Sequence, residues 1–275
     1  MTKQHLAAIA LALAAAAPAV GAQSFAYKPG AQRYRLEQTM AQTQEMQGQK
    51  MDMNMTSAQF ISLAAAAQGA NLGLTYTVDS VRFDAPTGSA AAMAGQVVEA
   101  QAAQAKALTG KKVIATISPL GEVSSLAAAD TTDAVGKGLA LGFRTFLVAF
   151  PSADVKAGMT WTDTTKSSMS NMGLDVTTTA IMTYTVAGDT TVHGRKAWKV
   201  AQQGTMTLSG MGNSQGADLV MSGGGTINGL AFVGQDGIYL GGQTEQMQNM
   251  TLEVPAASMS VPITNKITTK IVPVQ

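Results

Sequence analysis

The sequence predicts a mainly β protein of the α+β class, in which one large curved antiparallel sheet, a half-barrel, carries two helices on its concave face. Several runs of alternating apolar and polar residues are much longer than a typical strand of about five or six residues. Two segments with helical features interrupt these runs near the middle of the chain. Long strands with helices between them favour a sheet that curves around the helices. A plain β-sandwich is the alternative, but it would not need the two helices.

The first half of the predicted domain shows the alternation clearly. Apolar side chains recur at every second position from Tyr34 onward, and Gly48 and Gly69 mark turns between the runs. The runs cover residues 34–46, 51–56, 60–67 and 72–83. Because hairpin-sized turns join consecutive runs, we expect a four-stranded antiparallel meander here.

Two segments have helical character. Residues 90–108 are rich in Ala, Gln and Glu, which have high helix propensity, and Gly110 follows as a stop signal. The second segment follows the capping residue Asp133 and ends before Pro151. Its apolar residues are spaced as on one face of a helix: Leu139, Phe143, Phe146, Leu147 and Phe150. We expect this helix to lie across the concave face. Its phenylalanines then either fill the space against the concave face or cover a pocket there.

The rest of the chain continues in the same pattern. Alternation over 174–200 predicts a long hairpin with a turn at Gly188-Asp189, and further alternating runs reach Val274. No stretch has the length and composition of a linker between domains. We therefore expect a single domain over residues 34–275, preceded by a loose leader over 23–33.

Residues 1–22 have the features of a signal peptide. Lys3 precedes an apolar run that is too short to span a bilayer, and Val20-Gly21-Ala22 is a small-residue cleavage site. The chain contains no cysteine, so no lipid can be attached at the new N-terminus. We expect cleavage near Ala22 and a soluble protein, periplasmic or secreted, without a membrane-spanning segment.

The composition excludes several classes of function. A net charge of +1 with 13% charged residues provides no basic surface for nucleic acid or anionic membrane. After the signal peptide, His193 is the only histidine, which rules out zinc sites of His and Cys. No serine lies in a nucleophile motif, and the carboxylates have solvent-facing parity. We predict no catalytic residue, no metal and no cofactor, and interpret the protein as non-enzymatic.

The alternating methionines Met51, Met53 and Met55 are the most unusual local feature. Thioethers on one face of a strand are soft ligands that suit Cu(I). Methionine also fills irregular apolar space and adapts to varied ligands, and it is spread through the whole chain. Apolar lining is the favoured interpretation, with copper binding as a less favoured alternative.

A set of turn and core motifs resembles a known group of proteins. The motifs are Gly121-Glu122-Val123, Phe150-Pro151, Gly158-x-x-Trp161, Tyr184-x-Val186-x-Gly188 and Gly194-Arg195-Lys196-Ala197-Trp198-Lys199-Val200. With them the chain, over 34–274, resembles uncharacterised exported bacterial domains that are similar in fold to periplasmic lipoprotein and lipid carriers of the LolA, LolB and LppX type. The resemblance implies a curved sheet with helices on its concave side and a cleft that binds acyl chains. The lipid-anchor cysteine that many relatives carry is missing.

These observations lead to two functional expectations. The first is a soluble exported protein that binds a lipid or other apolar ligand in a cleft between sheet and helices. The second is a structural or interaction protein of the cell envelope with a filled core; protein partners are not predicted. The expected ligand-lining residues are Met51, Met53, Met55, Leu72, Leu74, Tyr76, Phe143, Phe146, Met182 and Tyr184.

Overall fold

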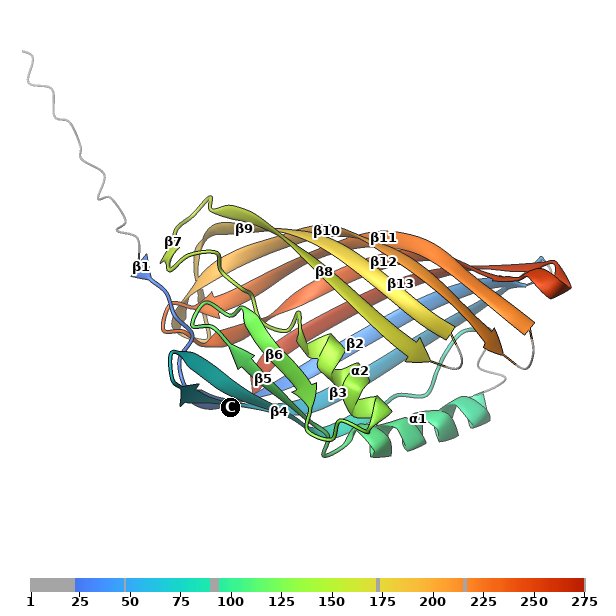
Figure 1. Ribbon diagram of the computed structural model, residues 1–275, viewed down its shortest axis with the longest axis horizontal. Coiled ribbons are helices and arrows are strands. Elements are labelled where there is room, and N and C mark those ends of the chain that lie inside the picture. The colour runs from blue at the N-terminus through green and yellow to red at the C-terminus, as the bar shows by residue number, and fades with distance from the viewer. Residues whose placement is uncertain (1–22, 47, 90–93, 172–173, 215–216, 275) are drawn as a thin grey trace, which may run out of the picture.

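The computed structural model describes residues 23–46, 48–89, 94–171, 174–214 and 217–274 (Figure 1). The predicted signal peptide lies outside these residues. The large sheet contains β2 (Gly30–Met46), β3 (Gln49–Gln68), β4 (Asn71–Phe83), β5 (Lys112–Ile117), β6 (Val123–Ala128), β8 (Thr160–Asn171), β9 (Leu174–Val192), β10 (Arg195–Ser214), β11 (Ala217–Gly234), β12 (Tyr239–Val254) and β13 (Met259–Val274). A small sheet pairs β1 (Gln23–Ser24) with β7 (Asp154–Val155). The helices are α1 (Ala94–Leu108) and α2 (Ala134–Phe143), and a short 3₁₀ turn (Pro255–Ala257) joins β12 to β13.

The large sheet is antiparallel throughout and open. Its strand order is β6-β5-β4-β3-β2-β13-β12-β11-β10-β9-β8, so two meanders meet where β2 pairs with β13. Strands β6 and β8 form the two edges, and the connection over 129–159, which contains α2, runs from one edge to the other (Figure 1). The prediction of a mainly β protein with one large antiparallel sheet and two helices is confirmed. No helix among the described residues has the length and hydrophobicity needed to cross a membrane.

The strand register shows which residues share a face. Buried Tyr34 lies opposite Ile61, and on the other flank buried Val200 lies opposite Val186. We call the face that carries these residues the inner face. From their row to the far end of the sheet, Asp163 is the only charged residue at an inner-face position within the described ranges. Because successive side chains alternate between faces, the other strand charges lie on the outer face.

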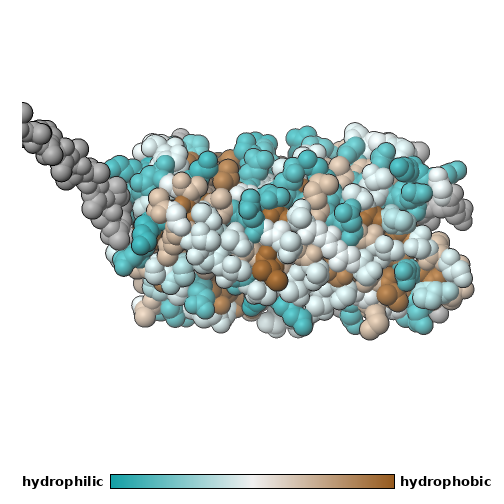
Figure 2. Space-filling view, turned by 90° about the horizontal axis from the view of Figure 1, so that it is seen from above, coloured by the Kyte–Doolittle hydropathy of each residue, from teal (hydrophilic) through white to brown (hydrophobic). Residues whose placement is uncertain are grey.

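The outer surface is mixed in polarity. Cross-strand ion pairs occur there, such as Lys266 with Glu245 at 2.8 Å. Some exposed hydrophobic side chains also lie there, including Ile181 and Met211. Figure 2 shows such residues scattered singly among hydrophilic ones on the face seen from above. Scattered single hydrophobic residues are ordinary for a protein surface.

The hydrophobic core lies at the Tyr34 end of the inner face. The rings of Phe143 and Phe146 stack with centroids 5.6 Å apart, and Tyr76 of β4 contacts both edge-on, at 5.2 and 5.7 Å. Phe146 also contacts Tyr34 and Tyr239, and the Tyr34 hydroxyl donates to the Tyr239 carbonyl oxygen at 2.8 Å. The connection between the two edge strands thus packs its aromatic residues onto β2, β4 and β12.

The second helix is shorter than predicted. α2 ends at Phe143, and the following segment alternates, with Phe146, Val148 and Phe150 buried and the residues between them more exposed. Its polar backbone groups bond to distant segments. The Phe150 amide donates to the Leu120 carbonyl oxygen at 2.9 Å, and the Tyr27 hydroxyl donates to the Val148 carbonyl oxygen at 2.9 Å. The prediction of a helix up to Phe150 was wrong because these tertiary contacts replace the helical hydrogen bonds.

Two strand boundaries also differ from the prediction. The runs 51–56 and 60–67 belong to one strand, β3, since no turn residue separates them and the same parity continues from Met55 to Ile61. The long hairpin turns at His193-Gly194 rather than at Gly188-Asp189. Gly188, at φ +133°, accommodates a bulge opposite β10 instead.

The segment 23–33 also differs from the loose leader that the sequence predicted. Phe25 and Tyr27 are buried, and the Phe25 ring lies 4.7 Å from that of Phe150. The Phe25 amide donates to the Ala153 carbonyl oxygen, and the Tyr27 amide donates to the Pro119 carbonyl oxygen, both at 2.7 Å. Burial of these two aromatic rings is favourable and holds the segment against the core. Its turn-like composition did not indicate this packing.

Candidate functional site

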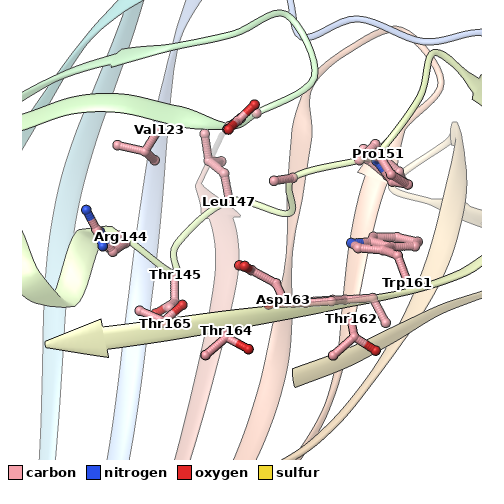
Figure 3. Close-up of a pocket in the computed structure, with 15 residues that line it drawn as sticks. Val123, Arg144, Thr145, Leu147, Pro151, Trp161, Thr162, Asp163, Thr164 and Thr165 are labelled. Carbon is pink, nitrogen blue, oxygen red and sulfur yellow. The ribbon is translucent and has the colours of Figure 1, made fainter. Parts of the chain in front are cut away.

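A cavity of about 350 Å³ lies between β8–β9 and the segment 144–151 that follows α2 (Figure 3). The turn before β6 forms its third side. The residues around it are Gly121, Glu122, Val123, Arg144, Thr145, Leu147, Ala149, Phe150, Pro151, Trp161, Thr162, Asp163, Thr164, Thr165 and Tyr184. This volume is within the range of sites for small ligands.

Two stacked aromatic rings form one wall of the cavity. Trp161 of β8 lies opposite Tyr184 of β9, and their rings are nearly parallel at 13° with centroids 5.3 Å apart. Phe150 contacts the Trp161 ring at 5.5 Å. Because these rings come from the sheet and from the crossing segment, the wall is fixed from both sides.

The segment after α2 forms the opposite wall. Leu147 and Ala149 are half-buried and line the cavity, Phe146 and Val148 are buried in the core, and buried Phe150 borders both. These alternating positions follow from the extended backbone of the segment.

Gly121 is required where the turn before β6 meets this segment. Its φ is +95°, and a Cβ there would lie 2.6 Å from the Val148 carbonyl oxygen and 2.7 Å from the Tyr27 ring. Both the backbone conformation and the lack of space exclude a larger residue. This glycine therefore lets the turn approach closely enough to border the cavity.

The rim of the cavity is polar. Arg144, Glu122 and Asp163 are exposed, and Thr145 and Thr165 lie near them around the opening. Figure 3 shows the Asp163 side chain pointing from β8 into the cavity. Among the described residues no cluster of His, Cys, Asp and Glu could hold a metal ion. The lining thus combines aromatic and aliphatic side chains with many polar and charged ones, a mixture that suits an amphipathic molecule.

The structure separates the predicted lining residues into three places. Leu72, Leu74, Tyr76, Phe143 and Phe146 are buried in the core, where Leu72 and Leu74 also border a much smaller cavity of about 50 Å³. Of the ten, only Tyr184 lines the large cavity. The remaining four predicted residues lie elsewhere on the inner face. Met51, Met53 and Met55 are half-buried, and Met182 is buried.

Sequence reasoning missed most residues of this cavity. It placed Trp161 only in a turn-and-core motif and Leu147 on the apolar face of a helix, and it assigned no role to Asp163 or Thr165. Trp161, Asp163 and Thr165 do share one parity on β8, which is the signal that the sequence contained. Their position beside Leu147 depends on the path of the chain between the two sheet edges, which local periodicity does not specify.

The ionisation of Tyr184 reports on the cavity. Burial, together with the nearby Asp163 carboxylate, raises the pKa of Tyr184 from 10.0 to about 12. In the unfolded chain this phenol ionises first, so its contribution to stability is present below pH 10 and is lost as the pH rises to about 12.

We predict that Asp163→Asn lowers the pKa of Tyr184, because removing the carboxylate removes an unfavourable charge interaction with tyrosinate. Near-ultraviolet absorbance of the phenolate, with Tyr184→Phe as the difference reference, measures this. The other tyrosines ionise at higher pH because burial raises the pKa of each of them further, as for Tyr34 and Tyr76. An unchanged Tyr184 titration would show that Asp163 does not act on the cavity wall.

No protein-family model and no curated protein matches the chain.

Proposed function

We propose that the protein binds a lipid or other apolar ligand in the cavity between β8–β9 and the 144–151 segment, and that the sheet acts as a half-barrel with the helices on its concave side. The observation that carries this proposal is the cavity's position beside an inner face with a single charge. Asp163 and Thr165 line the cavity, and in the strand register they lie opposite Met182 and Ala180 of the inner face. The cavity therefore adjoins a long, otherwise uncharged surface.

The lining suits an acyl chain with a polar end. Contact with Leu147, Ala149 and the Trp161–Tyr184 stack would remove methylene groups from water, at about 0.8 kcal/mol for each buried CH₂. The half-buried methionines farther along the inner face have unbranched side chains that adapt to a flexible chain. The charged and threonine side chains at the rim would remain with the polar head group.

The proposed setting is the periplasm or the exterior of the cell, following the signal-peptide features of residues 1–22. The proposed role is that of a non-enzymatic carrier or binding protein, in line with the resemblance to LolA-type carriers. Gentle purification followed by native mass spectrometry tests this role directly. A co-purified acyl compound supports this role. Failure of the delipidated protein to bind any fatty-acid probe would contradict it.

We predict that Leu147→Asp weakens the binding of a fluorescent fatty acid at least tenfold, because it places a carboxylate against the apolar chain. Ile181→Asp is the matched control. Ile181 lies on β9 but faces outward and is 49% exposed, so its replacement should leave binding unchanged. Equal loss in both variants would contradict the assignment, and thermal unfolding confirms that both are folded.

A structural role in the cell envelope is the second candidate. Phe143 and Phe146 fill the Tyr34 end of the inner face, which is the arrangement that a filled core requires. The same probe-binding experiment separates the two roles. Recovery of an envelope protein in a pull-down, without any bound acyl compound, would favour this second role.

A further inference from the structure

We propose that the inner face contains a site for a soft monovalent ion, Cu(I) or its analogue Ag(I), formed by the thioethers of Met40, Met53 and Met55. This inference does not rest on the proposed binding of an apolar ligand. It rests on a neighbour that the sequence run alone does not reveal, since Met40 belongs to a different strand.

The strand register brings the three residues together. Met40 of β2 lies directly opposite Met55 of β3. Residues directly opposite each other in an antiparallel pair have Cβ atoms about 4.5–5.5 Å apart. Met53 lies two positions before Met55 on the same face, roughly 7 Å along the strand and diagonal to Met40. Because each sulfur extends two bonds beyond Cβ on a flexible side chain, the three sulfurs can converge on one ion.

Met51, the first methionine of the alternating run, is peripheral. Met51 lies opposite Gln44, and Met53 lies opposite Gln42, so amide groups replace a second cross-strand methionine there. The centre of the site is therefore shifted from the middle of the sequence run to its end at Met55. This predicts an unequal contribution, with Met51 less important than Met40.

The surroundings favour a soft ion. All three methionines are half-buried, so they are neither sealed in the core nor fully hydrated. Ile267 lies opposite Met40 on the other side, and no inner-face charge lies on β2, β3 or β13. Thioethers select Cu(I), whereas divalent ions that prefer carboxylate, imidazole or water ligands gain nothing from this set.

The chemistry of thioethers provides a distinctive test. A thioether carries no proton that a metal must displace, so its affinity for the ion should not change between about pH 5 and pH 7.5. A site that used an imidazole ligand would weaken in acid, because a histidine must be unprotonated to bind a metal ion. His193 lies in the β9–β10 turn, beyond the Tyr34 end of the inner face, and is exposed, which makes it the competing ligand to exclude.

The experiment is titration of the full mature chain with Ag(I), and with Cu(I) under a reducing atmosphere, against a competing chelator. We expect one ion per chain and methyl-methionine NMR shifts at Met40, Met53 and Met55. The triple variant Met40→Leu/Met53→Leu/Met55→Leu should lose at least tenfold in affinity, since leucine keeps the volume but removes the sulfur. The single variant Met51→Leu should lose less than Met40→Leu.

The control variant replaces three exposed methionines, Met211, Met247 and Met259, by leucine. It should bind Ag(I) as the parent does, with the same thermal unfolding. Equal affinity of the triple variant and the parent would overturn the proposal, as would a loss of affinity in acid that His193→Gln abolishes. Because fatty-acid binding is measured separately, failure of the metal site leaves the proposed function untouched, and the reverse also holds.

Discussion

Phe146→Ala is expected to lower the free energy of unfolding by about 3–5 kcal/mol, the range for removing a large aromatic side chain from a core. Phe146 is buried, and its ring contacts Tyr34, Tyr76, Phe143 and Tyr239. The substitution therefore removes contacts to three strands and to the end of α2 at once. Urea unfolding followed by tryptophan fluorescence measures the change.

The control for this variant is Ile181→Ala on the outer face. Ile181 is 49% exposed, so its replacement should change stability by no more than about 0.5 kcal/mol. A loss below about 1 kcal/mol for Phe146→Ala would mean that the ring does not anchor the connection to the sheet. In that case the segment after α2 would be a loosely held cover.

Gly121→Ala is expected to cost about 2–5 kcal/mol through two separate effects. The positive φ of +95° penalises any residue with a Cβ by about 1–2 kcal/mol. Contact of that Cβ with the Val148 carbonyl oxygen and the Tyr27 ring adds a packing penalty of about 1–3 kcal/mol. The turn must then move away from Val148, so fatty-acid binding should weaken too.

Gly158→Ala separates the two effects. Gly158 has a similar φ of +82°, but nothing lies within 4 Å of a Cβ added there. It should show only the backbone penalty, about 1–2 kcal/mol. Equal losses for Gly121→Ala and Gly158→Ala in urea unfolding would mean that the close approach at Gly121 relaxes without cost.

The strands were predictable because a sheet with one buried face imposes a period of two. Leu72, Leu74, Tyr76 and Val78 alternate in the sequence, and all four are buried on β4, with half-buried residues between them. The Ala- and Gln-rich helix was predictable from propensity, and α1 ends at Leu108 before Gly110, as expected. These features depend on neighbours a few residues away.

The candidate site was not predictable in the same way. The spacing of Phe143, Phe146 and Phe150 fits a helix as well as it fits a short turn followed by an extended segment. The choice depends on acceptors such as Leu120, which lie distant in the sequence. Similarly, Trp161 becomes a cavity wall only because Tyr184 lies opposite it, and pairing register is a tertiary property.

The pairing of β2 with β13 has a consequence for how the chain folds. These strands come from opposite ends of the domain, yet their pairing joins the two meanders at the middle of the sheet. Each meander can form from local hairpins, but the junction must wait until β13 has been synthesised. Closing such a distant pair is slow because its loop entropy is paid before its contacts form. Until then both meanders expose unpaired central edges, so the chain is expected to be prone to aggregation before β2 and β13 pair.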